Sequence, residues 1–171
     1  MSTKIAELLL AELEREAAGT RRALERVPEG RDDWKPHEKS MPLGYLASLV
    51  ATIPGWVASM ITQDALDIGA AGELQTRGFA TNRELLEAFD KAMTRAREAF
   101  ATTTDEHLTT TSWQLMVNGH VVSDQLRYEA IRDGAFNHLV HHRGQLTVYL
   151  RLNDVPVPSL YGPSADEKTF G

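Results

Sequence analysis

The sequence of 171 residues contains no cysteine. This absence excludes disulfide bonds, thiolate-bound zinc and a cysteine nucleophile, so any thiol chemistry would require a thiol from outside the chain. The sequence also lacks an unbroken run of about 18 apolar residues, and its start lacks the apolar core and cleavage site of a secretory signal. We therefore expect a soluble, cytoplasmic protein without a membrane-spanning segment.

Positive charge is also scarce. The chain has 18 basic and 24 acidic residues, for a net charge of −6. A nucleic-acid partner is disfavoured, because binding phosphates requires a cationic surface, and the arginines between residues 15 and 26 alternate with glutamates. The sequence has no P-loop, dinucleotide-binding glycine pattern or Ser-His-Asp order. With 42% apolar residues, it is long enough to bury one core, so we expect a single domain over residues 1–171.

Apolar residues that recur every three or four positions predict a first helix over Ile5–Val27, with Leu8 among its apolar positions. Pro28 is expected to end it. A second amphipathic segment follows Ser40, which resembles a helix cap. Pro54 lies inside this second segment and predicts a kink, because proline cannot donate a backbone hydrogen bond.

The third helix is predicted by a capping box at Thr81–Glu84 and should end near Thr102. A long connection follows, with a short extended piece or hairpin around Asn118-Gly119. Ser123 is expected to cap the fourth helix, which runs to about Asn153.

The second half of the fourth helix is apolar nearly all round, which indicates burial on two sides. One side would face the bundle and the other a second subunit, so we predict a homodimer through this helix. After it, residues 155–163 contain three prolines and should lie extended on the surface, anchored by Leu160 and Tyr161. The predicted fold is all-α: a four-helix bundle with a long connection between helices 3 and 4 and an extended C-terminal tail.

His138 and His142 are the residues most capable of chemistry. They stand four apart on the core-facing side of the fourth helix, where two imidazoles can share a divalent ion such as zinc or nickel. Two ligands are one short of the usual catalytic set of three. The alternative is that both are structural imidazoles that make hydrogen bonds inside the bundle.

The residues next to His138 and His142 limit the kinds of reaction that the two imidazoles could support. Leu139 stands where the zinc protease motif needs its glutamate, so a metalloprotease is disfavoured. His141 points away from the pair, and Gln145 is placed to orient an imidazole. Arg143 is expected to be structural, with anion binding as the alternative.

Other donors lack a spacing that favours metal binding. Loop histidines could fold over the bundle, and nearby carboxylates are interpreted as surface charges; these residues are His37, His107, His120, Asp64, Glu129 and Asp133. Trp56 and Trp113 are predicted to pack near element ends, where they could line a pocket.

Four stretches resemble the DinB family, also called DinB/YfiT-like metalloenzymes; they cover residues 34–41, 46–56, 138–146 and 155–163, in the family's order. The resemblance implies a four-helix bundle, commonly a homodimer, with a metal held by one histidine from helix 2 and two from helix 4. The helix 4 ligands correspond to His138 and His142. The helix 2 histidine corresponds to Leu49, so this chain departs from the pattern at the third ligand. Some relatives resemble thiol-dependent transferases that use a divalent metal.

Two functions therefore remain open. One is a DinB-like binding or stress-associated module whose degraded metal site has become an apolar pocket near Leu49, with a metal weakly held or absent and a small molecule as its ligand. The other is a divalent-metal-dependent enzyme, such as a thiol-dependent transferase, that uses His138 and His142.

Overall fold

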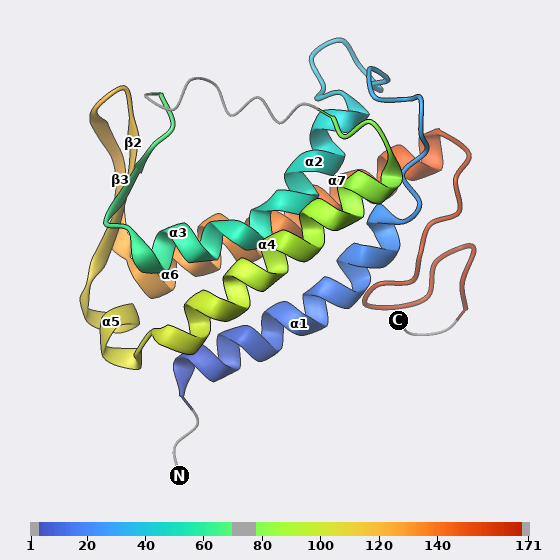
Figure 1. Cartoon of the computed structure of the whole chain (residues 1–171). Helices are drawn as coiled ribbons and strands as arrows, with labels where there is room; N and C mark the ends of the chain where they lie inside the picture. Colours follow the sequence, from blue (N-terminus) through green and yellow to red (C-terminus); the bar gives the residue numbers. More distant parts are fainter. Residues whose placement is uncertain (1–3, 70–77, 169–171) are drawn as a thin grey trace.

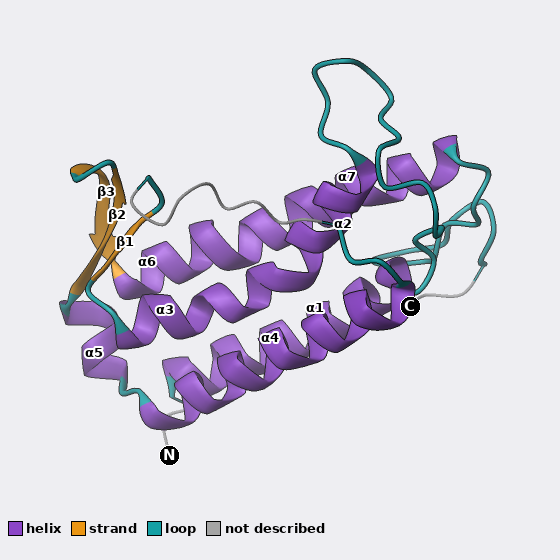
Figure 2. Ribbon diagram, turned by 45° about the horizontal axis from the view of Figure 1, so that its top comes forward, coloured by secondary structure: helices purple, strands orange, loops and turns teal. Residues whose placement is uncertain are grey.

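The computed structural model describes residues 4–69 and 78–168. Most of these residues are helical, and a small sheet is present (Figures 1 and 2). The helical elements are α1 (Ile5–Leu24), α2 (Leu43–Thr52), η1 (Ile53–Gly55), α3 (Trp56–Thr62), α4 (Asn82–Thr102), α5 (Asp105–Thr110), α6 (Arg127–Ile131), η2 (Arg132–Asn137) and α7 (His138–Leu152). The strands are β1 (Ala65–Asp67), β2 (Ser112–Val117) and β3 (His120–Leu126).

The long helices pack side by side around one apolar core. α4 lies against α1 on one side and against α2 and α3 on the other, while α7 packs on α2 and α1. Figure 2 shows the sheet at one end of the helices and the C-terminal tail at the other. The core is formed by the apolar stripes of these helices, so their sequence periodicity sets the packing.

The first and third predicted helices are confirmed as α1 and α4. Thr81 Oγ1 accepts a hydrogen bond from the backbone N–H of Glu84 at 3.2 Å, as the capping box requires. α1 ends at Leu24, three residues before the predicted end, and a turn then continues to Val27. Leu8 was expected on the core face but is 57% exposed, because α1 is covered on only part of its circumference.

The second predicted helix begins later than expected and changes its form at Pro54. Pro42 is its first flanking residue, whereas Ser40 lies in the preceding turn and does not cap it. Pro54 lies in the 3₁₀ segment η1, and Figure 1 shows the axis changing direction between α2 and α3. The 20 residues from Leu43 to Thr62 are long and apolar enough to cross a membrane by length and composition, but 72% of the tested window is buried inside the protein, as in a core helix.

The all-α prediction is wrong, because the described residues contain a three-stranded sheet of order β1-β2-β3. β2 and β3 form the predicted hairpin at Asn118-Gly119, and both turn residues have the positive φ angles, 50° and 78°, that a tight hairpin turn requires. β1 pairs with β2 in parallel, across a long separation in sequence. The connection before the last helix also contains a helix, α5, whose cap is Thr104.

The fourth predicted helix begins at Arg127 rather than at Ser123, which lies inside β3. Pairing with β2 holds that segment in an extended form despite its capping residue. Between α6 and α7, the backbone adopts the wider π-helical turns of η2. The helix ends at Leu152 as expected, although Leu152 is 53% exposed. The homodimer through this helix stays a prediction, and Val148, 56% exposed, is a second apolar position available to a partner.

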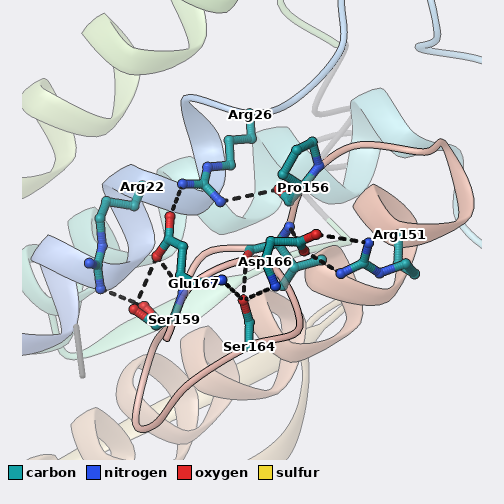
Figure 3. Close-up of polar contacts among 9 residues, drawn as sticks. Arg22, Arg26, Arg151, Pro156, Ser159, Ser164, Asp166 and Glu167 are labelled. Carbon is teal, nitrogen blue, oxygen red and sulfur yellow. Dashed lines mark hydrogen bonds and ion pairs between the residues drawn. The ribbon is translucent and has the colours of Figure 1, made fainter. Parts of the chain in front are cut away.

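The tail does not continue the helix, as the prolines predicted; it lies against α1 and α7 with bends at residues 160–162, and ion pairs hold it (Figure 3). The Arg26 guanidinium donates to the Glu167 carboxylate, and Arg151 donates to Asp166. Glu167 also accepts from the backbone N–H of Ser159 at 2.8 Å. These bonds lower the pKa of Glu167 to about 2, with the Ser159 N–H as the largest cause and Arg26 next.

Candidate metal and ligand site

His138 and His142 lie together on successive turns of α7, directly after the π-helical segment η2. Their ring centroids are 4.5 Å apart. The Trp56 indole packs edge-on against His138, with centroids 5.3 Å apart. His142 is buried, with 9% exposure, and His138 is half-buried. The sequence therefore predicted correctly which residues pair, and Trp56 is the neighbour that tertiary packing adds.

His142 contacts Gln145 through one ring nitrogen. Its Nδ1 lies 2.7 Å from Oε1 of Gln145, and in the tautomer in which Nδ1 donates to this oxygen, Nε2 keeps its lone pair. Burial lowers the pKa of His142, opposed by the bond to Gln145. Burial also lowers the pKa of His138, and the neighbouring His142 adds to this effect. Both rings therefore favour the neutral form, which is the form that binds metals.

Leu49 lies on the helix that faces this pair. α2 and α7 run antiparallel, since Tyr149 Oη donates to the Met41 carbonyl at one end and Trp56 packs on His138 at the other. Counting residues inward from the two contacts places Leu49 opposite residues 141–145 of α7, a range that includes His142. Its side chain is 8% exposed. An apolar isobutyl group thus occupies the part of α2 from which a third ligand would come.

The other candidate ligands have different partners. Nε2 of His107 lies 3.0 Å from the Ile61 carbonyl, and His37 Nδ1 accepts from the Lys39 N–H at 3.1 Å. Asp64 pairs with the buried Arg127 guanidinium, and Glu129 accepts from the first turn of α6. Over residues 4–69 and 78–168, no group of three histidine or carboxylate side chains is placed to hold a metal ion. Two imidazoles alone do not fit the three-ligand set that the resemblance implies.

Arg143 is structural, as expected, and is buried more deeply than a helix-edge arginine would be. It is 2% exposed and points away from the histidines toward α1. It donates to the Glu16 carboxylate at 2.6 Å and to Thr20 Oγ1 at 3.1 Å, and also bonds the Tyr161 hydroxyl. Its charge is thus compensated inside the protein, and the anion-binding alternative has no support.

A cavity of about 400 Å³ lies between the sheet and the helices, and His138 forms part of its wall. Its lining is mostly apolar and comes from three regions of the chain: Trp56, Met60, Leu66, Ile68, Trp113, Leu115 and Ala130. The polar lining residues are Ser59, Ser123, Gln125, Asp133 and His138, with Gly134 beside them. Trp56 and Trp113 therefore line a pocket, as the sequence suggested.

The sequence did not predict most of this cavity, because it indicated only a hairpin around Asn118-Gly119 and not the strand β1 beside it. The alternation of Trp113 and Leu115, two residues apart, is the signal that could have identified a strand with one apolar face. Gly134 on η2 lies close to α3: a Cβ there would lie 2.6 Å from the terminal methyl of Met60, the flexible end of a side chain that could shift to make room. The cavity is thus bounded by a close helix contact on one side and the hairpin on the other.

Comparison with known proteins gives one consistent result. A model of the DinB family matches residues 1–169. The chain is similar to the crystal structure of a DinB-like protein from Bacillus cereus, with 23% identity, a TM-score of 0.70 and coverage of 94% of this chain and 100% of that one. A DinB-like protein from Bacillus subtilis gives 16% identity, a TM-score of 0.68 and coverage of 95% and 99%. The chain matches no curated protein.

Proposed function

This chain belongs to the DinB family, and we propose that it is a small-molecule-binding member of that family with a degraded metal site. Its ligand site is the cavity walled by His138, Trp56 and Trp113. The observation that carries the proposal is this cavity of about 400 Å³, because specific sites for small ligands are concave, mostly apolar and of this size. The few polar groups in its wall would orient a ligand.

The side chains available to bind a metal beside the cavity favour a small-molecule-binding role over metal catalysis. His138 and His142 supply two imidazole nitrogens, whereas catalytic zinc sites use three protein ligands. Leu49 adds an apolar wall at the level where a third ligand would be needed. We therefore expect this pair to hold divalent zinc or nickel only weakly.

Titration with N-phenyl-1-naphthylamine tests the proposal, because this neutral dye is small enough for the cavity and fluoresces when it leaves water. We expect saturable, one-to-one binding by the wild-type protein. Ser59→Phe puts a ring into the lining and should reduce affinity at least tenfold, while Ser112→Phe, on an exposed position of β2 outside the cavity, should leave it unchanged. No binding, or an equal loss in both variants, would disprove the ligand site.

A second function, a divalent-metal-dependent enzyme such as a thiol-dependent transferase, is favoured by one observation. In the tautomer in which Nδ1 of His142 donates to Gln145, Nε2 is free to bind a metal, with the His138 ring 4.5 Å away. A bound ion would supply Lewis acidity and stabilise a thiolate. Metal analysis of protein purified without a histidine tag separates the two functions: one tightly held equivalent that is lost in His142→Ala would favour the enzyme.

A further inference from the structure

The charge of the cavity wall is negative and lacks a compensating cation. Asp133, on η2, is the one carboxylate residue among the described lining residues, none of which is a lysine or arginine, and it is exposed at this part of the wall. Its carboxylate accepts from two neutral amides, those of Asn137 at 3.1 Å and Gln125 at 3.5 Å. Among the described residues it forms no ion pair. An anionic ligand would meet repulsion here, and a cationic one would be attracted.

Two indole rings line the same cavity. Trp56 comes from α3 and Trp113 from β2, and both contribute to the lining. Indole is the side chain that attracts organic cations most strongly through its π face, and this attraction increases where water is excluded. Trp113 is only 6% exposed, so protein neighbours cover most of its indole and hold the ring in place in the wall. A carboxylate with two indoles is a combination suited to an ammonium group.

The volume of the cavity and its apolar lining residues indicate the chemistry of the uncharged part of the ligand. A bare inorganic cation would leave most of the 400 Å³ unfilled, and Leu66 and Leu115 offer it no ligand atom, while Met60 offers only a thioether, a poor ligand for a hard cation. These side chains match an apolar body instead. His138 adds one neutral hydrogen-bonding group to the wall.

We propose that this cavity binds a small organic ammonium ion, with its charged head near Asp133 and the indoles and its apolar body against Met60 and the sheet. The inference rests on the proposed ligand site and adds the ligand's chemical class. Substituted or quaternary amines with an aromatic or alkyl body meet this description.

Three probes of matched shape test the charge preference: benzyltrimethylammonium, its neutral carbon isostere neopentylbenzene, and the anion phenylmethanesulfonate. Binding is followed by tryptophan fluorescence and by calorimetry. We expect the ammonium probe to bind on the order of tenfold more tightly than the neutral isostere, with the sulfonate weakest. If the neutral probe binds as well as the cation, the ammonium inference is wrong while the ligand site stands. If none of the three binds and the naphthylamine dye also fails, the proposed function itself is wrong.

Two aspartate variants test whether Asp133 causes the preference for the ammonium probe. Asp133→Asn should weaken the ammonium probe on the order of tenfold and leave the neutral probe unchanged. Asp124→Asn removes the same charge from an exposed position on β3 outside the cavity and should change neither. An equal loss in both variants would show that the preference comes from the net charge of −6 and would overturn the assignment to Asp133. The wild-type comparison of the three probes decides the charge preference even if Asp133→Asn does not fold.

Discussion

Replacing Leu49 with histidine should convert the two-imidazole pair into a three-ligand metal site. Leu49 is 8% exposed and lies on the antiparallel helix α2, opposite the part of α7 that contains His142. An imidazole there would join Nε2 of His142 and the adjacent His138 ring. Three histidines on two packed helices form an open site suited to zinc.

The size of the effect follows from known zinc energetics. Four-ligand zinc sites release about 10–16 kcal/mol at neutral pH, so one ligand contributes about 3 kcal/mol. The Leu49→His variant should therefore bind zinc roughly a hundredfold more tightly than the wild type. Without metal it should be less stable by about 1.5–3 kcal/mol, because a buried leucine side chain is lost.

Competition with a chromophoric zinc chelator measures the affinity, and thermal unfolding with and without zinc measures the linked stability. At a hundredfold excess over Kd, zinc should restore about 2.7 kcal/mol. Adding His142→Ala to the variant is the control, and it should return zinc affinity to the wild-type level. Unchanged zinc affinity in a folded Leu49→His protein would refute the placement of Leu49 opposite the histidines.

Two further predictions concern the tail and the α1–α7 interface. Glu16→Ala removes the carboxylate that pairs with the buried Arg143 guanidinium and should lower the free energy of unfolding by about 3–5 kcal/mol, as measured by urea unfolding. Arg143→Met removes the buried charge itself and should lower the free energy of unfolding by less. Equal losses of stability in the two variants would contradict this. Because the pKa of Glu167 is lowered to about 2, its contribution is complete above its ordinary value of 4.5 and is lost as the pH falls toward 2. The protection factor of the Ser159 amide against hydrogen exchange should fall over that range, and Glu167→Gln should abolish this pH dependence.

The sequence predicted the helices well because their signals are local. α1 and α4 follow from apolar residues at three and four spacing, and the Thr81–Glu84 capping box marks the start of α4. Pro54 marked the change in the second helix, and Asn118-Gly119 marked the hairpin turn. Each of these features depends on residues within one or two helical turns of each other.

The strand β1 and the start of the last helix were mispredicted, because both depend on pairing with β2 and not on the propensities of their own residues. β1 has three residues and is a strand only through its parallel pairing with β2, which lies far along the chain. Ser123 has the chemistry of a helix cap, but its segment pairs with β2 and stays extended. Local propensity was overridden by tertiary hydrogen bonding at both positions.

For the site, the amino-acid order alone determined that His138 and His142 share a helix face, because the α-helical repeat places residues four apart side by side. It also determined that cysteine chemistry is absent. Only the tertiary structure placed Leu49 opposite the part of α7 that contains His142, turned Arg143 toward α1, and formed a cavity lined by Trp56 and Trp113. These features require segments tens of residues apart to pack together, and packing is a property of the whole fold rather than of any local pattern.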